Sequence, residues 1–253
     1  MKSTLRGLRR AAARPALFLG VFALGLLPSC LEPIRTVIYQ DNFAGDFTQW
    51  VVEQMPGGTT RFHEGSLVID DADGCTVWFR EKLSGSVDIS YDVTVVQKGG
   101  PHDRVSDLNC FWMATDPRAP DGCPFAPGHG RSGKFADYDS LLTYYVGYGG
   151  NTNTTTRFRR YDGTPARPLL PEHDLSDKKF LLTPNQTYHI RLVARDGTAE
   201  FWRDGKKIFT FQDPAPLTGG WFAFRTVHSH LEIRNFHASE AELLPVPPPD
   251  AKP

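Results

Sequence analysis

Short runs rich in Val, Ile, Phe, Tyr, Trp and Thr recur from residue 36 to residue 237, and this pattern most constrains the fold. Clusters of Gly, Asp, Asn and Pro separate the runs at intervals of about ten residues, as in sandwiches and barrels. Helical spacing of apolar residues is nearly absent. We therefore expect an all-β fold with strands near residues 36–40, 49–53, 66–70, 76–80, 87–97, 108–114, 141–148, 155–161, 188–195, 199–203, 207–212, 221–226 and 230–237.

Two Asp-Gly pairs, Asp196-Gly197 and Asp204-Gly205, lie between strand patterns in the C-terminal half. Asp-Gly is a strong hairpin signal because a two-residue type I′ turn needs positive φ at both central positions. The sequence therefore predicts a meander of three consecutive strands.

The first thirty residues have the pattern of a targeting segment. Arginines precede an apolar run at residues 15–27, which is short for a membrane span, and Leu27-Pro28-Ser29-Cys30 then resembles a bacterial lipobox. We expect a lipoprotein-type signal peptide over residues 1–30, lipidation at Cys30, and export to the periplasm or cell surface as a membrane-anchored lipoprotein. Ordinary signal cleavage, with Cys30 lost or free, is the alternative.

The remaining chain divides into a β-sandwich domain at residues 31–240 and a Pro-rich tail at residues 241–253, which we expect to be disordered. The formal charge is −1, from 28 Lys plus Arg and 29 Asp plus Glu. Composition therefore gives no general attraction to nucleic acid or to an anionic membrane surface. We expect membrane contact only through the lipid anchor, no nucleic-acid partner, and a monomer.

Three cysteines follow Cys30 in the sequence. Cys110 and Cys123 are the favoured disulfide pair of an exported protein, because they would close a Pro- and Gly-rich segment. Cys75 lies in an apolar strand pattern and is expected to be buried. No CxxC or HxxxH spacing indicates zinc, and we expect no metal or other cofactor with the exception of calcium. Calcium could bind an acidic cluster that a tight turn also explains, formed by Asp70, Asp71 and Asp73.

Several segments resemble a known superfamily. The C-terminal stretches 188–193, 201–208, 219–224 and 231–236, with an opening Asp41-Asn42-Phe43, resemble the concanavalin A-like lectin/glucanase superfamily, whose members include laminin-G-like modules. The resemblance implies a concanavalin-like jelly-roll sandwich of two antiparallel sheets, and it says little about the reaction.

Two more segments, residues 106–113 and 144–151, look like those of an uncharacterised bacterial secreted family associated with polysaccharide degradation and related to 3-keto-disaccharide hydrolase domains. This resemblance implies a polysaccharide or oligosaccharide partner. The chain lacks the ExDxxE string of laminarinase-type glucanases and the characteristic strings of alginate-lyase-like enzymes.

Tyrosine, asparagine and arginine gather between residues 138 and 161. Aromatic faces stack on sugar rings, and amides and guanidinium groups hydrogen-bond hydroxyls or pair with acidic substituents. Three insertions, at residues 98–107, 115–140 and 162–184, are candidate walls of a groove. The alternative is that the tyrosines pack between sheets and the arginines are solvated. The candidate substrate-binding residues are Asn109, Tyr144, Tyr145, Asn151, Asn153, Arg157 and Arg159.

Catalysis by β-elimination needs a group that neutralises the carboxylate, a base and an acid. We assign these roles to Arg225, His228 and Tyr148, with Arg157, Arg159 and Tyr145 as substitutes. Hydrolysis would instead use carboxylates, and Asp107 is the favoured one because Asp107 and Asn109 share one face of an otherwise apolar strand. The alternative is that Asp107 begins the strand and binds loop amides.

The sequence thus predicts an exported, carbohydrate-active protein with an open sugar-binding groove. A polysaccharide lyase is favoured as its activity, and a glycoside hydrolase comes next. The alternative is a non-catalytic, lectin-like surface lipoprotein that binds carbohydrate.

Overall fold

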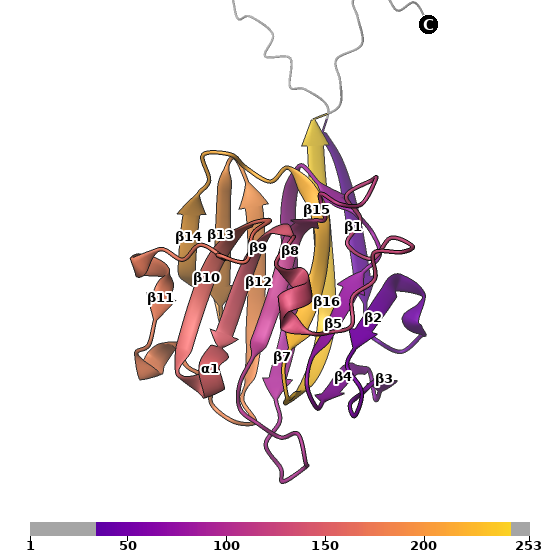
Figure 1. The fold of residues 1–253 in the computed structure, drawn as a ribbon, viewed down its shortest axis with the longest axis vertical. Helices are drawn as coiled ribbons and strands as arrows, with labels where there is room; N and C mark the ends of the chain where they lie inside the picture. The colour runs from indigo at the N-terminus through magenta and orange to yellow at the C-terminus, as the bar shows by residue number, and fades with distance from the viewer. Residues whose placement is uncertain (1–33, 244–253) are drawn as a thin grey trace, which may run out of the picture. The chain divides into compact units, whose positions relative to one another are not determined.

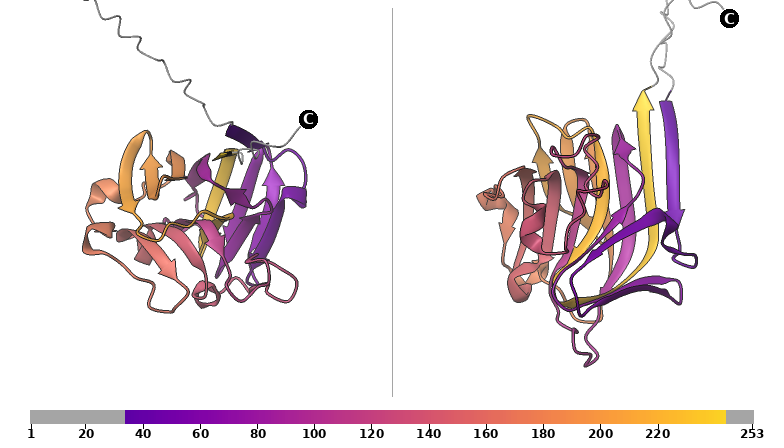
Figure 2. Two further views of the ribbon diagram at one scale, coloured as in Figure 1. Left: turned by 90° about the horizontal axis from the view of Figure 1, so that it is seen from above. Right: turned by 45° about the vertical axis from the view of Figure 1, so that its right-hand side comes forward.

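The computed structural model describes residues 34–243, which form two antiparallel β-sheets packed face to face (Figure 1). The two layers are seen from above in Figure 2. The all-β sandwich of two antiparallel sheets is confirmed. The predicted signal peptide, Cys30 and the tail from residue 244 lie outside the described residues.

The first sheet has the order β14-β13-β12-β7-β16-β4-β3, and β1 pairs with the second half of β16. Its last strand continues to Leu243, three residues beyond the predicted domain end at residue 240. The bounds are β1 (Ile34–Asp41), β3 (Thr59–His63), β4 (Ser66–Asp71), β7 (Ser86–Val95), β12 (Thr187–Arg195), β13 (Thr198–Arg203), β14 (Lys206–Gln212) and β16 (Ser229–Leu243).

The second sheet has the order β11-β10-β9-β8-β15-β5-β2, and β6 pairs with β15. Its strands are β2 (Trp50–Gln54), β5 (Cys75–Phe79), β6 (Leu83–Ser84), β8 (Leu108–Thr115), β9 (Leu142–Gly149), β10 (Thr155–Asp162), β11 (Asp174–Leu175) and β15 (Gly219–Thr226). Single helical turns occur in the connections, at η1 (Phe47–Gln49), η2 (Phe135–Tyr138), α1 (Gly150–Asn153), η3 (Pro171–His173) and η4 (Lys178–Phe180).

The strands β12, β13 and β14 form the predicted meander. In the first turn Asp196 and Gly197 have φ values of 50° and 74°, and in the second Asp204 and Gly205 have 50° and 73°. These left-handed backbone angles at both central positions are what a two-residue hairpin requires, so the Asp-Gly signal is confirmed.

The main core fills the space between the sheets and follows from alternation along the strands. In β7, Val87, Ile89, Tyr91, Val93 and Val95 point inward while the residues between them are partly exposed. Burial of each such apolar side chain contributes about 1.5–3 kcal/mol to folding. The pattern fixes which face of β7 meets the second sheet.

A second apolar cluster lies on the outer face of the second sheet. The connection from β8 to β9, residues 116–141, crosses this face, and we call it the cover segment. Its Tyr138 ring stacks on Phe111 at 5.5 Å between centroids, and Phe111 stacks on Trp78 at 5.9 Å. Because both faces are covered there, β5 and β15 are buried along most of their length instead of alternating.

The cysteine pairing expected from sequence is wrong. Cys75, Cys110 and Cys123 are all free thiols. Cys110 points into the core between the sheets, whereas Cys123 lies in the cover segment against the outer cluster. The sheet separates the two sulfur atoms, so the pair cannot close without moving backbone.

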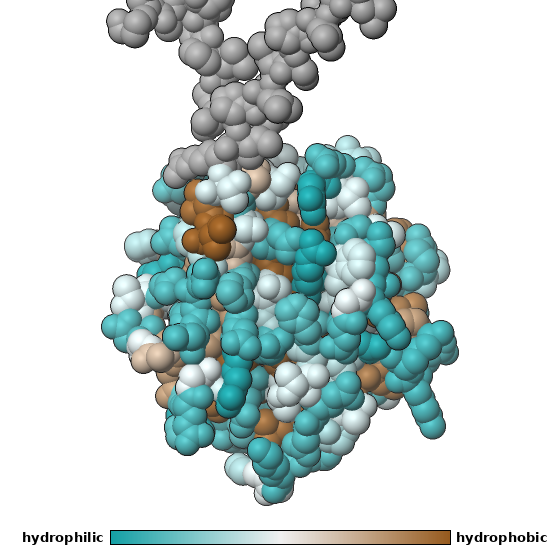
Figure 3. Space-filling model, turned by 180° about the vertical axis from the view of Figure 1, so that it is seen from behind, coloured by the Kyte–Doolittle hydropathy of each residue, from teal (hydrophilic) through white to brown (hydrophobic). Residues whose placement is uncertain are grey.

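The outer face of the first sheet is mainly hydrophilic, as Figure 3 shows from that side. Cross-strand pairs such as Asp88 with Arg191 and Asp92 with His189 occupy it. Within residues 34–243, no helix is long and apolar enough to cross a membrane.

Candidate functional site

A row of polar residues crosses the outer face of the second sheet. The strand register places one residue from each of seven neighbouring strands side by side, so their side chains share this face. The row, called the polar row below, consists of Glu53, Thr76, Arg225, Asn109, Gly147, Arg157 and Asp174.

One end of the polar row is buried under the cover segment. Glu53 is only 6% exposed, and its carboxylate accepts hydrogen bonds from Trp78 Nε1 at 2.8 Å, Tyr138 Oη at 2.9 Å and the Arg131 backbone N–H at 2.7 Å. Arg225 is fully buried beside it. These contacts hold the cover segment to the sheet.

The cover segment is also tied to itself by a buried ion pair. Arg131 Nη2 lies 2.6 Å from Asp116, which also accepts two guanidinium hydrogen bonds from Arg118. Burial raises the pKa of Asp116, but the hydrogen bonds from Arg118 and the charges of both arginines outweigh it, so the pKa is lowered. The carboxylate therefore stays charged and bonded.

The other end of the polar row is open. A depression of about 440 Å³ lies over β8, β9 and β10, and its floor includes Asn109, Gly147 and Arg157 from the row and Tyr145 and Arg159 from the next row along the strands. Each of the three long insertions contributes to the walls. The wall residues from them are Arg104 and Asp107, Phe135, and Arg167.

Gly147 makes room for the depression. A Cβ at this position would lie 2.9 Å from Tyr145 Oη and 3.2–3.3 Å from two of its ring carbons. The tyrosine ring therefore lies across the glycine instead of standing out from the sheet. Burial raises the pKa of Tyr145, so its hydroxyl keeps its proton at neutral pH.

Asp107 and Asn109 form a bonded pair at one wall. Asp107 accepts hydrogen bonds from Arg104 Nη2 at 2.8 Å, Ser106 Oγ at 2.6 Å and Asn109 Nδ2 at 3.2 Å. Asn109 is 3% exposed, and its Oδ1 has no partner among the described residues. The structure thus leaves this amide oxygen without a hydrogen-bond donor, buried at the wall of the depression.

The structure brings six of the predicted site residues to this depression: Asp107, Asn109, Tyr145, Asn151, Arg157 and Arg159. Five other predicted site residues lie elsewhere, and each corrects the sequence-based assignment for a physical reason.

Tyr144 and Tyr148 lie on the opposite face of β9, inside the core between the sheets. The Tyr144 hydroxyl donates to Asp213 at 2.8 Å and accepts from the Leu217 backbone N–H at 3.2 Å. Tyr148 is 1% exposed and packs against the Tyr188 ring at 5.4 Å. Both hydroxyls face the core between the sheets, so the structure does not bring Tyr148 to the depression with the other predicted site residues.

Arg225 is on the correct face but under the cover segment. Its Nη1 donates to Thr76 Oγ1 at 3.0 Å and to the Gly133 carbonyl at 2.6 Å, and its guanidinium lies 5.0 Å from the Tyr138 ring centroid. Phe135 lies over it as well, at 5.4 Å. The geometry makes Arg225 part of the buried end of the polar row.

His228 and Asn153 serve local structure. His228 Nδ1 lies 2.7 Å from the Ala72 carbonyl, and its backbone N–H donates to Asp71 at 2.9 Å. Asn153 makes two hydrogen bonds with the backbone of Leu182, at 2.9 Å and 2.8 Å. Neither side chain lines the depression.

Sequence reasoning missed Arg104, Phe135, Gly147 and Arg167. Three of these lie in the insertions that were predicted to form walls, so the region was indicated but the individual side chains were not. Gly147 had no signal beyond being a glycine within a strand, which suggests close approach of another group.

The acidic cluster does not form a metal site. Asp70 lies 2.7 Å from His102 Nδ1, Asp71 is buried against the β15–β16 turn, and Asp73 is exposed. Residues 34–243 contain no group of three His, Cys, Asp or Glu side chains placed to hold a metal ion.

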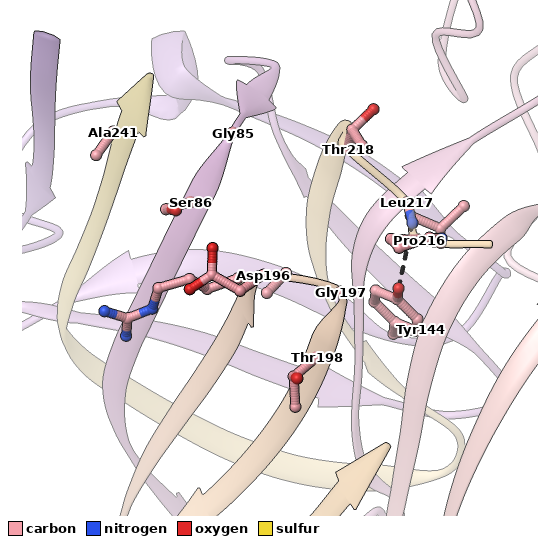
Figure 4. A pocket seen from close by; sticks show the side chains of 12 residues that line it. Gly85, Ser86, Tyr144, Asp196, Gly197, Thr198, Pro216, Leu217, Thr218 and Ala241 are labelled. Carbon is pink, nitrogen blue, oxygen red and sulfur yellow. Dashed lines mark hydrogen bonds between the residues drawn. The ribbon is translucent and has the colours of Figure 1, made fainter. Parts of the chain in front are cut away.

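A second depression, of about 570 Å³, lies at the opposite end of the sandwich near the β12–β13 turn (Figure 4). Its walls are mainly small residues such as Gly85, Ser86 and Gly197, and the Tyr144 hydroxyl within it is already bonded to Leu217. It is larger than the depression over β8–β10 but presents fewer convergent polar side chains. The depression over β8–β10 is therefore the stronger candidate.

Solved structures with the same fold are numerous. A protein of unknown function with a galectin-like fold from Bacillus subtilis superimposes with a TM-score of 0.63 at 19% identity, over 80% of this chain and 95% of that one. The carbohydrate-binding module CBM66 from Bacillus subtilis gives 0.51 at 12% identity, over 77% and 96%.

Winged bean acidic lectin, solved with methyl-α-D-galactose, gives a TM-score of 0.53 at 9% identity, over 83% of this chain and 100% of the lectin. These likenesses confirm the lectin-like jelly-roll fold expected from the concanavalin-like resemblance.

Comparison with curated proteins gives no match. A family model, in contrast, matches residues 69–236, which run from β4 to β16 and include the whole polar row except Glu53. The chain belongs to the family described as "Domain of unknown function (DUF6250)".

Proposed function

We propose that this protein binds a carbohydrate in the open depression over β8, β9 and β10. The observation that carries the proposal is the floor itself, where the Asn109 amide, the Tyr145 ring and the guanidinium groups of Arg157 and Arg159 converge around the space left by Gly147. Planar amide and guanidinium groups form hydrogen bonds with sugar hydroxyls, and an aromatic ring stacks on the apolar face of a sugar.

The fold supports the same proposal. CBM66 is a carbohydrate-binding module and winged bean acidic lectin was solved with a bound galactoside, and both share the jelly-roll architecture. Fold alone does not assign function, so the argument depends on the side chains of the depression.

Binding fits these side chains better than either reaction considered from the sequence. Elimination needs a base, but the lining contains no histidine and Tyr145 holds its proton because burial raises its pKa. Hydrolysis by paired carboxylates needs two acids about 5–10 Å apart. Asp107 is the one carboxylate among the described lining residues, and three donors already occupy it.

The N-terminal sequence pattern also supports a proposal about the cellular location of the protein. We propose that the chain is exported and held at a membrane through lipidated Cys30, four positions before the first described strand residue, Ile34. Fractionation of cells that express the wild type and Cys30→Ser tests this. Release of only the variant from membranes supports the anchor, and release of both contradicts it.

A glycan array probed with the exported chain tests carbohydrate binding. The variants Tyr145→Ala and Asn109→Ala should lose at least tenfold in affinity for any glycan that the wild type binds. Arg191→Ala, on the outer face of the first sheet, is the matched control and should bind normally.

Bound glycans should also be incubated with the protein while reducing ends and the ultraviolet absorbance of unsaturated uronates are followed. Unchanged glycans agree with a binding role, whereas product formation would show an activity beyond it. Failure of every glycan to bind would contradict the proposal.

A further inference from the structure

Four arginines surround the depression, and three of them have a carboxylate partner. Arg104 lies 2.8 Å from Asp107, and Arg157 lies 2.8 Å from Asp174. Arg167 pairs with Asp139 and stacks over the Phe135 ring at 4.4 Å. Each of these three guanidinium groups forms an ion pair within the protein and is held in place by it.

Arg159 is the exception. It faces the depression from β10, next to Tyr145 in the register, and its described hydrogen bond goes to the Arg167 backbone carbonyl. It has no carboxylate partner among the described residues. Burial lowers the pKa of Arg159, and the positive charges of Arg157 and Arg167 lower it further, but an arginine stays protonated in proteins.

A partly desolvated cation beside two others is unfavourable until an anion joins it. The fold maintains this cation although a carboxylate could have been supplied, as it is for each neighbouring arginine. Arg159 lowers the pKa of Asp174, but that carboxylate is bonded to Arg157, so the unpaired guanidinium of Arg159 points to a negative group on the ligand.

The Asn109 amide adds a second, independent requirement. Its Nδ2 faces Asp107 Oδ1, so its Oδ1 points away from that carboxylate and is buried without a partner. An amide oxygen accepts and cannot donate, so it needs an N–H or O–H from the ligand. An inorganic anion without a proton satisfies Arg159 alone, whereas a sugar with an acidic substituent satisfies both groups.

The spacing of the two groups agrees with such a ligand. Asn109 and Arg159 lie two strands and two residues apart on the sheet, which places their Cα atoms about 12 Å from each other. A ligand that contacts both therefore extends over the floor formed by Gly147 and Tyr145.

We propose that the ligand is an acidic saccharide, whose carboxylate or sulfate group pairs with Arg159 while a sugar hydroxyl donates to Asn109 Oδ1. This inference rests on the proposed carbohydrate-binding function and names the chemical class of the ligand. It adds Arg159 as the residue that determines specificity.

Calorimetry with matched pairs of oligosaccharides tests it. The pairs are oligogalacturonate against the same oligomer with its carboxylates reduced to hydroxymethyl groups, and a sulfated galactan oligomer against its desulfated form. The wild type should bind one acidic member at least tenfold more tightly than its neutral counterpart, which corresponds to one charge-assisted hydrogen-bonded pair. The preference should shrink as salt is added.

The variants Arg159→Gln and Arg159→Lys complete the test, with Arg191→Ala as the control. Arg159→Gln should remove the preference for the acidic member, so that the acidic and neutral members bind it equally. Arg159→Lys should keep part of the preference because it keeps the charge. Circular dichroism establishes that each variant is folded.

The outcomes separate this inference from the function on which it rests. Equal binding of acidic and neutral members, unaffected by Arg159→Gln, would overturn the acidic ligand and leave carbohydrate binding intact. An acidic preference that survives Arg159→Gln would overturn the role of Arg159. No binding to any member, charged or neutral, would overturn both.

Discussion

The two ends of the polar row show how one sheet face serves two purposes. At the β2–β5–β15 end, Glu53 and Arg225 are buried under the cover segment, which supplies hydrogen-bond partners to the Glu53 carboxylate and one to Arg225 Nη1. At the β8–β9–β10 end, Asn109 and Arg157 are also polar and lie in the same row, but they line an open depression. The main difference between the two ends is that the cover segment crosses the first end and leaves the second open.

The two ends of the polar row differ in whether the protein itself supplies the partners of their polar groups. Every oxygen of Glu53 is satisfied within the protein, whereas Asn109 Oδ1 and the Arg159 charge are left for something else. Buried polar groups are normally bonded. Arg225 Nε and Nη2 are also unbonded, but they lie under the cover segment, whereas Asn109 Oδ1 lies at the wall of an open depression, where a ligand can be its partner. Four experiments test this difference between the two ends, beginning with the one expected to have the largest effect.

Removing the Glu53 carboxylate should break the buried end. Glu53→Ala leaves the Trp78 and Tyr138 donors and the Arg131 backbone N–H without their acceptor, and we expect it to destabilise folding by about 3–5 kcal/mol. Urea denaturation measures the change. Hydrogen exchange should also quicken in the cover segment.

Glu232→Ala is the control for this variant, because Glu232 lies on the outer face of the first sheet and is only half-buried. It should change stability by less than about 0.5 kcal/mol. A Glu53→Ala protein as stable as this control would show that the cover segment does not depend on the carboxylate.

Filling the space at Gly147 should disturb the open end. In Gly147→Ala the new methyl group meets Tyr145 Oη at 2.9 Å, so the ring must shift, and we expect a loss of about 1–3 kcal/mol together with weaker glycan binding. Thermal melting and calorimetry measure the two effects.

Gly150→Ala is the matched control in the same depression, since a Cβ there has no neighbour closer than 3.7 Å. It should keep the wild-type stability to within about 1 kcal/mol. Equal destabilisation by the two substitutions would mean that the Tyr145 contact is not what makes Gly147 necessary.

The two faces of β9 show which part of the candidate site could be predicted from the sequence and which part could not. Alternation correctly placed Tyr144 and Tyr148 on one face of β9 and Tyr145 on the other, but it could not say which face was outward. Both faces of this strand are buried by aromatic residues, so hydropathy gives no contrast between them. The choice depends on the other sheet, which only the tertiary structure supplies.

Arg225 and His228 illustrate the second limit. Both occur near strand ends in a polar context, which is where catalytic groups occur as well. The cover segment that buries Arg225 comes from residues about ninety positions earlier in the chain, as its hydrogen bond to the Gly133 carbonyl shows. Strand periodicity is local and contains no information about such a crossing.

The loop that carries Arg104 and Asp107 to the open end should respond to acid through Asp103. Asp103 accepts hydrogen bonds from the backbone N–H groups of Lys98 at 2.6 Å and Gly100 at 3.0 Å, and it lies 2.8 Å from His230 Nδ1. Burial raises the pKa of Asp103, but these bonds outweigh it and hold the pKa below 3.8.

A lowered native-state pKa means that the stability contributed by Asp103 is fully present above the unfolded-state pKa and is lost as the pH falls through the native-state value. The wild type should therefore lose more stability than Asp103→Asn when the pH is lowered from 7 to 3. Denaturant titrations at the two pH values measure the difference. Parallel losses in the two proteins would show that Asp103 does not anchor this loop.

The smallest effect is expected at Cys123, and it tests whether noncovalent contacts alone hold the cover segment. Burial raises the pKa of Cys75 and Cys110 to about 12, whereas Cys123 is partly exposed and its pKa, also raised by burial, is shifted less. Of these three thiols, only Cys123 should react with a thiol reagent in the native protein, and all three should react after unfolding.

Cys123→Ser should change the free energy of unfolding by less than about 1 kcal/mol, and a reductant should not change the wild-type stability. A native protein with only one reactive thiol after unfolding would instead require a disulfide, and the cover segment would then be held covalently.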